Sequence, residues 1–233
     1  MNFQPKPFIL LCSLFCFISC KSQVTFSEPE SLKAVSDTTF VNLNSYSQDF
    51  VYDMKYASED NFLKSKVYDC AECYLRYKTV KKLIDANQKF MAFGYKIKLY
   101  DCYRPLDIQK KMWKIVSNPI YVADPSKGSI HNRGGAVDIT LVDKNGLELE
   151  MGTTFDYFGK EASHDYNDLP EKVLQNRKLL KEIMESCSFK AFQSEWWHYH
   201  WPNDRGYEVL DLPFQKLKNQ EDILYCIQWI NQN

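Results

Sequence analysis

From Phe40 to the C-terminal end, no Gly-, Pro- or Ser-rich gap, internal repeat or low-complexity run interrupts the sequence. Domain boundaries fall in such gaps because few contacts cross them. We therefore predict that residues 39–233 form a single domain. A chain of 233 residues is long enough to bury one full apolar core and to leave terminal segments outside it.

The N-terminal end of the chain differs in character from this domain. Lys6 precedes an apolar run from Phe8 to Ile18 that is too short to span a bilayer, which predicts a signal peptide over residues 1–19. The segment Phe17-Ile18-Ser19-Cys20 resembles a bacterial lipobox, in which the cysteine carries the lipid and begins the mature chain. An ordinary secretory signal cut near Ser22 is the alternative, and both interpretations export the domain.

The segment between signal peptide and domain is expected to be a linker. Residues 20–38 are polar and lack a sustained hydrophobic period, as a flexible tether would. With a lipid on Cys20, this linker would hold the domain at a membrane. We therefore expect the protein in the periplasm or at the cell surface.

The charge balance bears on the class of partner. The chain has 29 basic and 30 acidic residues and a formal net charge of -1. Nucleic-acid backbones attract proteins with a basic excess, so a nucleic-acid partner is disfavoured.

Five cysteines lie beyond the lipobox: Cys70, Cys73, Cys102, Cys187 and Cys226. An oxidising compartment permits disulfides, and an odd number leaves at least one thiol unpaired. Cys70 and Cys73 have the spacing of half a zinc ribbon or of a redox pair, but a ribbon needs a second Cys-x-x-Cys and the sequence has none. We expect a structural disulfide or two buried thiols there, with the pairing left open.

Apolar periodicity predicts the order of helices and strands. Three- and four-residue spacing predicts helices over residues 72–93, with Gly94 at the C′ position, and over residues 105–116, 170–186 and 220–230. Strand patterns lie at residues 95–100, 134–142 and 189–201. The alternation is irregular, unlike the repeats of a doubly wound sheet. An α+β fold is therefore favoured, with a central antiparallel sheet flanked by helices.

Two segments combine histidines with carboxylates. His131 lies seven residues before Asp138, and Gly134 and Gly135 between them permit a turn that would fold the two side chains together. A second segment reads Glu-Trp-Trp-His-Tyr-His from residue 195. Two histidines and one carboxylate are a standard catalytic zinc set that leaves a fourth tetrahedral position open for water.

The second segment leaves its ligand undecided. Glu195 and His198 are three residues apart, so a regular strand would point them to opposite faces. A bend, twist or bulge is required if both side chains serve one site. His200 shares the strand parity of His198, and spacing alone does not choose between these two histidines.

Two motifs together resemble the signatures of the zinc D-alanyl-D-alanine dipeptidases, the VanX type. They are Ser-x-His-x-x-Gly-x-Ala-x-Asp over residues 129–138 and Glu-x-Trp-His over residues 195–198. Three further matches occur in the family's order, at Asp53–Ala57 with Asn61-Phe62, at Tyr103-Arg104-Pro105 and at Met151–Asp156. The similarity covers residues 40–205. It implies the small zinc-binding α+β fold shared with D,D-carboxypeptidases and the hedgehog signalling domain.

The resemblance assigns the metal and the catalytic groups. It implies one Zn²⁺ per chain, held by His131, Asp138 and His198, and so selects His198 over His200. It implies Glu195 as the catalytic base. Arg104 is expected to be an electrophilic stabiliser.

The resemblance also implies the substrate and its contacts. The expected substrate is a small D,D-dipeptide, D-Ala-D-Ala, hydrolysed by Glu-assisted attack of zinc-bound water. Ser129 is expected near the substrate carboxylate. Asp156 and Tyr56 are expected near its free ammonium group.

Two alternative functions remain open. A peptidoglycan D,D- or L,D-carboxypeptidase on the same zinc fold is the nearer one, because export would bring it to cell-wall peptides. A non-catalytic, zinc-stabilised binding lipoprotein is the other. Relatives that confer glycopeptide resistance act in the cytoplasm, so for an exported chain we expect scavenging or turnover of D,D-dipeptides released from peptidoglycan.

Overall fold

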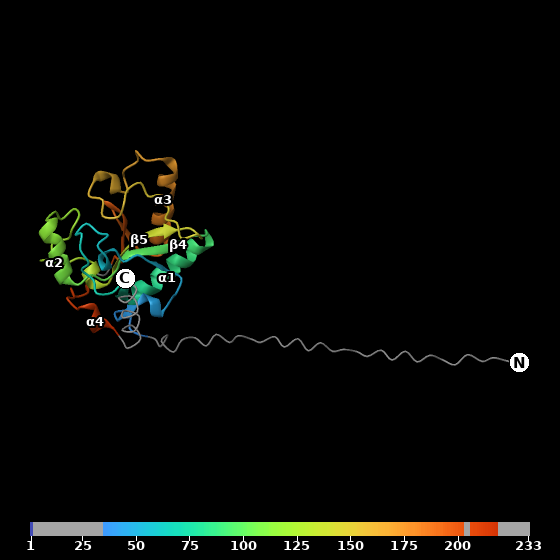
Figure 1. Ribbon diagram of the computed structural model, residues 1–233, viewed down its shortest axis with the longest axis horizontal. Coiled ribbons are helices and arrows are strands. Elements are labelled where there is room, and N and C mark those ends of the chain that lie inside the picture. Colours follow the sequence, from blue (N-terminus) through green and yellow to red (C-terminus); the bar gives the residue numbers. More distant parts are fainter. Residues whose placement is uncertain (2–34, 203–205, 219–233) are drawn as a thin grey trace. The chain divides into compact units, whose positions relative to one another are not determined.

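The computed structural model describes Met1, residues 35–202 and residues 206–218, and it centres on a five-stranded sheet (Figure 1). The strand order is β2-β4-β5-β7-β6. Strand β2 pairs parallel with β4, whereas the β4–β5, β5–β7 and β7–β6 pairs are antiparallel. The strands are Val51–Tyr52 (β2), Lys96–Asp101 (β4), Ala136–Val142 (β5), Glu195–His200 (β7) and Lys190–Phe192 (β6). The α+β prediction is confirmed, and the sheet is mixed because its β2 edge runs parallel.

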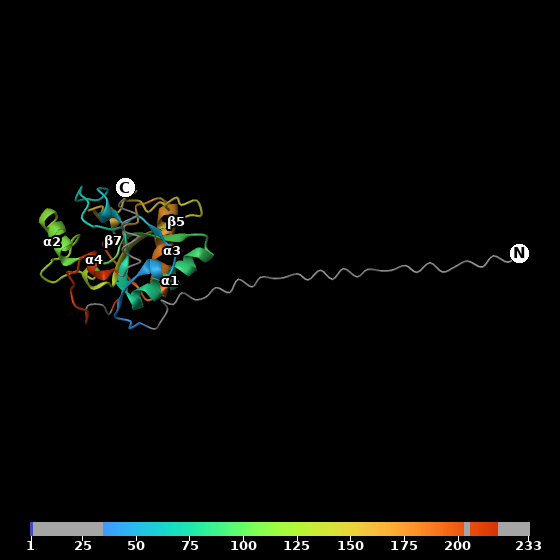
Figure 2. The same ribbon diagram turned by 60° about the horizontal axis from the view of Figure 1, so that its bottom comes forward.

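Two long helices cover one face of this sheet. Helices α1 (Tyr77–Ala92) and α3 (Glu171–Ser186) contact each other, and they contact β4 and β6 respectively (Figure 2). No residue of either helix lines the two cavities described below, which open on the other face. Helix α2 (Leu106–Ile115) lies on the opposite side of the domain from α3 in both views.

Strand β5 separates the core from the cavities. Its Val137, Ile139 and Leu141 are fully buried, and they point to the face opposite Asp138 and Thr140 because side chains alternate along a strand. One face of β5 therefore belongs to the apolar core, and the other presents a carboxylate.

Smaller elements complete the domain. A two-stranded sheet pairs β1 (Phe40–Asn42) with β3 (Tyr74–Arg76). Helix α4 is Phe214–Leu217, and short 3₁₀ helices occupy Leu43–Ser45, Lys55–Ala57, His131–Arg133 and Lys160–Ala162. Of the predicted linker, the structure describes residues 35–38, where Asp37 pairs with Lys81 at 2.6 Å. The predicted signal peptide and the helix over residues 220–230 lie outside the described residues.

Two predicted helices and two strands agree with the structure to within two residues, and the exceptions have physical causes. The helix predicted over residues 72–93 is wrong at its start, because Tyr74–Arg76 forms β3 and the helix begins at Tyr77. Pairing with β1 holds this segment extended, so long-range contacts override its apolar spacing. The segment 189–201 forms two strands joined by a turn. Gly94 follows α1 as predicted, with φ of +81°.

The described residues answer part of the question of cysteine pairing. Cys73, at the start of β3, forms a disulfide with Cys102, which follows β4. Cys70 is also disulfide-bonded, so Cys70 and Cys73 do not pair with each other. Cys187 is a buried free thiol, which agrees with the expectation of at least one unpaired cysteine.

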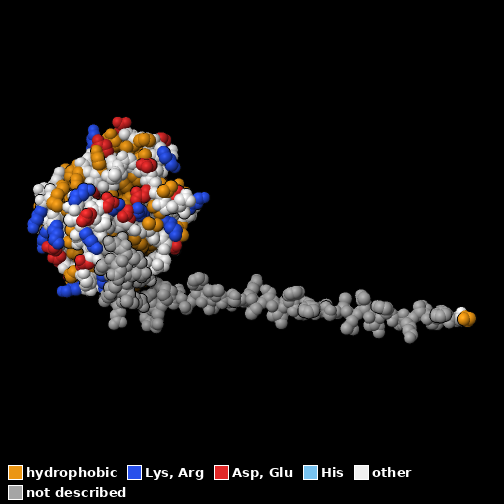
Figure 3. Space-filling view, in the orientation of Figure 1, with side chains coloured by type: hydrophobic (Ala, Val, Ile, Leu, Met, Phe, Trp, Pro, Cys, Tyr) orange, Lys and Arg blue, Asp and Glu red, His pale blue; other side chains and the backbone are white. Residues whose placement is uncertain are grey.

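The surface carries both signs of charge. Figure 3 shows lysine, arginine and acidic side chains interspersed on the face in view. Within the described part of the chain, no helix combines the length and apolar character that crossing a bilayer requires.

Candidate metal centre and active site

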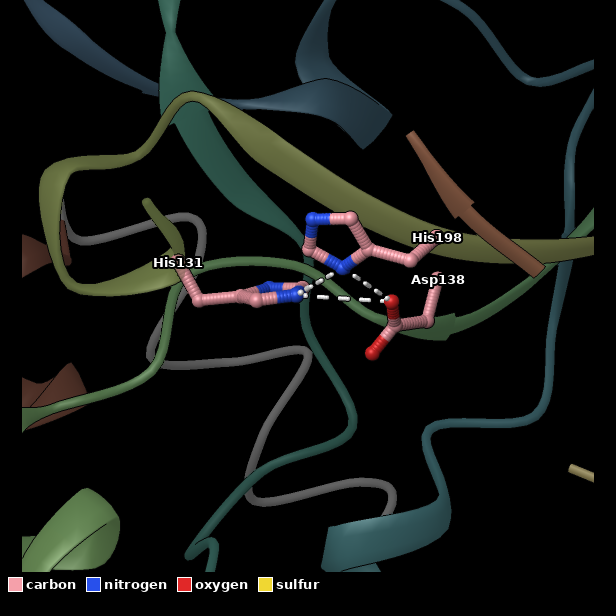
Figure 4. A group of neighbouring side chains, drawn as sticks. All are labelled: His131, Asp138 and His198. Atoms are coloured by element: carbon pink, nitrogen blue, oxygen red, sulfur yellow. Dashed lines mark hydrogen bonds and ion pairs between the residues drawn. The ribbon is translucent and has the colours of Figure 1, made fainter. Parts of the chain in front are cut away.

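Three side chains from separate elements converge at one end of β5 (Figure 4). Asp138 on β5 lies directly opposite His198 on β7 in the strand register. His131 lies in a 3₁₀ helix that ends at Gly134, where φ is +73°. A Cβ at this glycine would lie 2.4 Å from Cζ of Phe40, so only glycine fits the turn that returns His131 to Asp138.

The spacing of the three ligand atoms suits a zinc ion. His131 Nε2 lies 3.1 Å from His198 Nδ1 and 3.4 Å from Asp138 Oδ1. His198 Nδ1 and Asp138 Oδ1 are 3.0 Å apart. Zinc binds nitrogen and oxygen at about 2.0–2.2 Å, so two corners of its tetrahedron are separated by about 3.3–3.6 Å. The triangle is slightly tighter than this, and its three donors fit a tetrahedral site with one open position.

Contacts around the ligands hold them in the form that binds metal. The Nδ1–H of His131 donates to the carbonyl oxygen of Cys102 at 2.7 Å, which turns Nε2 toward the other two ligands. Burial alone would raise the pKa of Asp138, but His131 and His198 hold that pKa below its usual range. Asp138 is therefore ionised in the folded protein.

A bulge in β7 brings Glu195 to the same site. Ala191 and Phe192 are adjacent on β6, yet they pair with Tyr199 and Glu195, which lie four residues apart on β7. Glu195 and His198 are three residues apart, and a bulge of this kind is what allows both side chains to face one site. Glu195 Oε2 consequently lies 4.0 Å from Nδ1 of His198. Burial, together with the nearby carboxylates of Asp138 and Asp156, raises the pKa of Glu195 well above its usual range.

His200 lies close to the centre but outside the ligand triangle. Its ring centroid is 5.6 Å from that of His198, and the metal-ligand group comprises His131, Asp138 and His198 alone among the described residues. Its position supports the choice of His198 that the family resemblance implies.

We predict that His200→Ala retains one zinc ion per chain, whereas His198→Ala loses it, because only His198 completes the triangle. Zinc content after dialysis against a weak chelator measures both variants under one condition. Loss of the zinc ion from His200→Ala together with its retention in His198→Ala would show that His200 is the ligand.

Arg104 is fixed beside the centre by residues that the sequence analysis did not single out. Asp101 Oδ2 accepts from Arg104 Nε at 3.0 Å and from Nη2 at 2.7 Å, and Gln109 Oε1 accepts from Nη1 at 2.9 Å. Tyr68 donates to the other oxygen of Asp101 at 2.8 Å. Arg104 Nη2 lies 3.8 Å from Asp138, so the guanidinium is aimed at the ligands. One feature of the sequence could have indicated this partner: Asp101 directly follows a predicted strand and lies three residues before Arg104.

Asp156 and Tyr56 form a polar pair in the same cavity. The hydroxyl of Tyr56 donates to Asp156 Oδ2 at 2.8 Å. Asp156 has φ of +56°, an unfavourable conformation for a residue other than glycine and one that is often kept at functional sites. Burial, then the nearby charge of Asp138, raises the pKa of Asp156 to about 7.

Ser129 lies at the start of the loop that carries His131. Its N–H donates to Asn132 Oδ1 at 2.7 Å, and its Oγ accepts from the Asn132 N–H at 3.2 Å. Asn132 also donates to the carbonyl oxygen of Arg104 at 2.7 Å. This residue, which sequence reasoning left without a role, ties Ser129 to the arginine.

One cavity of about 790 Å³, which we call the catalytic cavity, brings the site residues together. The structure places all eight residues of the expected site along it: Tyr56, Arg104, Ser129, His131, Asp138, Asp156, Glu195 and His198. The guanidinium of Arg104, three metal-binding side chains, two further carboxylates and two hydroxyls therefore face one space, which suits a small substrate that carries charges of both signs.

Comparisons with known proteins agree with this arrangement. The Peptidase M15 family model, described as D-Ala-D-Ala dipeptidase, matches residues 36–218. The D-alanyl-D-alanine dipeptidase of Escherichia coli (strain K12) is 36% identical over 178 residues, which cover 76% of this chain and 92% of that protein. Those of Enterococcus faecium and Streptomyces coelicolor are 31% and 30% identical, each covering 64% of this chain and 84% of the relative. The chain therefore belongs to the D-Ala-D-Ala dipeptidase family of M15 peptidases and is a dipeptidase of the hydrolase class.

Proposed function

We propose that this chain hydrolyses D-Ala-D-Ala and related D,D-dipeptides with one zinc ion held by His131, Asp138 and His198. The convergence of these ligands with Glu195 in the catalytic cavity is the observation that carries the proposal. The relatives named D-alanyl-D-alanine dipeptidase support the substrate class.

Glu195 is placed to move the protons of the reaction. When bound, zinc would supply the positive charge that acidifies a water molecule and polarises the peptide carbonyl. The Glu195 carboxylate would take a proton from the attacking water and return it to the leaving amine. Its raised pKa makes this carboxylate a stronger proton acceptor, which suits the first of these transfers.

Arg104 is placed to stabilise the negative charge that grows on the carbonyl oxygen. Burial works against its charge, but the neighbouring Asp101 holds the pKa of Arg104 above its usual range, so the guanidinium stays ionised. Asp101 and Gln109 hold it in place before substrate arrives. A donor that needs no reorganisation lowers the barrier most effectively.

Asp156 and Tyr56 would receive the free ammonium group of the dipeptide. A peptide with a blocked N-terminus cannot make this ion pair, and it would leave the Asp156 carboxylate buried without its cationic partner. The pair thereby favours a dipeptidase over an enzyme that cleaves longer cell-wall peptides.

We predict that Asp156→Asn raises KM for D-Ala-D-Ala by roughly 10- to 100-fold, since a charge-assisted hydrogen bond contributes about 1.5–3 kcal/mol. In the wild-type protein, KM should rise as pH falls below about 7, because protonated Asp156 no longer attracts an ammonium ion. Asp156→Asn should lack this rise. Measuring KM against pH for both proteins tests the assignment, and identical profiles would contradict it.

The competing function is a D,D- or L,D-carboxypeptidase, which would act on blocked peptides. The deciding experiment compares kcat/KM for free D-Ala-D-Ala with kcat/KM for its N-acetylated form. We expect the free dipeptide to be hydrolysed far faster. Faster turnover of the acetylated peptide would overturn the dipeptidase proposal.

We further propose that the domain is exported and held at a membrane by a lipid on Cys20, where it degrades D,D-dipeptides released from peptidoglycan. The Cys73–Cys102 disulfide supports this location, because structural disulfides persist in oxidising compartments. Cell fractionation should find the processed chain in the membrane fraction. Uncleaved chain in the cytosol would count against export.

A further inference from the structure

A second cavity, of about 840 Å³, lies next to the catalytic cavity on the same face of the sheet. Thr140 lines it and lies two residues along β5 from Asp138, so both side chains point to this face. We call it the distal cavity. Besides Asp156, its walls include the following charged residues: Lys55, Asp60, Lys64, Glu148 and Glu150.

Three residues line both cavities, namely Phe62, Asp156 and Phe158, so their side chains stand between the two spaces. The rings of Phe62 and Phe158 meet edge to face, with centroids 5.1 Å apart. Tyr56 packs against Phe62 at 6.2 Å and Tyr121 against Phe158 at 5.2 Å. These four rings form a continuous aromatic row, in which Phe62 and Phe158 face both cavities and the two tyrosines face the catalytic cavity alone.

The row stands at the end of the site that would receive the substrate's N-terminus. Asp156, the proposed partner of the ammonium group, belongs to the same partition as Phe62 and Phe158. A residue added before the dipeptide and directed past Asp156 would therefore meet the rings of Phe62 and Phe158. Beyond them, the distal cavity presents both acidic and basic side chains.

We propose that Phe62 and Phe158 set the length of the peptide that this enzyme accepts, by blocking extension at the N-terminus. The inference rests on the proposed dipeptidase function and adds a steric barrier to the charge of Asp156. Rotating either ring away would break its contacts with the neighbouring rings, and aromatic pairs of this kind are each worth about 0.5–1.5 kcal/mol. Removing the rings should join the two cavities and leave the metal centre unchanged.

The test uses Phe62→Ala, Phe158→Ala and the double variant, each measured with D-Ala-D-Ala and with glycyl-D-Ala-D-Ala. Cleavage of the last bond of the tripeptide releases glycyl-D-Ala, which shows that the enzyme accepts an extra residue at the N-terminus. We expect the ratio of kcat/KM for the tripeptide to that for the dipeptide to rise at least tenfold in the double variant. Phe158 is 37% exposed, so Phe158→Ala alone should fold normally and show part of this rise.

Ile120→Ala is the matched control, because this exposed side chain lines the catalytic cavity but not the distal cavity. Its substrate ratio should equal that of the wild-type protein. A wild-type ratio in folded variants that still cleave the dipeptide would overturn the role of the two rings. Failure of the wild-type protein itself to cleave D-Ala-D-Ala would instead reject the proposed function, and this inference with it.

Discussion

Replacing His131 by alanine is expected to abolish both stoichiometric zinc binding and hydrolysis of D-Ala-D-Ala. His131 Nε2 lies within 3.4 Å of both other ligand atoms, and its Nδ1 is fixed by the Cys102 carbonyl. Loss of a partner that merely orients a ligand typically costs 10- to 100-fold in metal affinity, so loss of the ligand itself should cost more than about 100-fold. Zinc titration against a competing chelator, with turnover measured in the same samples, gives both quantities.

The matched control for this prediction is His200→Ala, which removes an imidazole from the same cavity but not from the ligand triangle. A His131→Ala protein that holds one zinc ion at wild-type affinity would show that the metal lies elsewhere. Equal losses in both variants would point to general destabilisation of the cavity.

Glu195→Gln is expected to keep zinc and to lose nearly all turnover. The substitution preserves the volume of the side chain but removes the group that accepts and returns the proton, a role that typically contributes about 10²–10⁴-fold in rate. We therefore expect kcat to fall by roughly 10³-fold while the zinc content stays at one ion per chain. Steady-state kinetics and metal analysis of the same preparation measure this separation.

Glu150→Gln is a suitable control, because Glu150 is an exposed carboxylate that lines the distal cavity only. Its kcat for the dipeptide should match that of the wild-type protein. If Glu195→Gln retained turnover within about tenfold of wild type, Glu195 would not be the general base.

The longer helices follow directly from local sequence. Helix α3 begins one residue after its predicted start and ends at the predicted residue, because its apolar stripe is continuous and Pro170 precedes it. The first helix was predicted too early: Leu75 lies five residues before Val80, which is not a helical interval, and pairing with β1 places residue 75 in a strand. Such pairing joins segments more than thirty residues apart and leaves no trace in a local pattern.

In the candidate site, too, some residues could be proposed from the sequence, whereas others could be found only from the structure. Residue types and motif order suffice to propose the ligands and Glu195, and the Asp138–His198 register together with the β7 bulge then accounts for their convergence. The supporting groups were not foreseen, because their roles depend on contacts in space. The Cys102 carbonyl that orients His131 is 29 residues away in the chain.

The most direct test of the account is a zinc titration of the metal-free protein, with D-Ala-D-Ala hydrolysis followed at each step. We predict that activity rises in proportion to added zinc and reaches its plateau at one equivalent per chain. Full activity without metal would contradict the proposed centre, and one tightly bound zinc ion with no hydrolysis would indicate a binding protein instead of an enzyme.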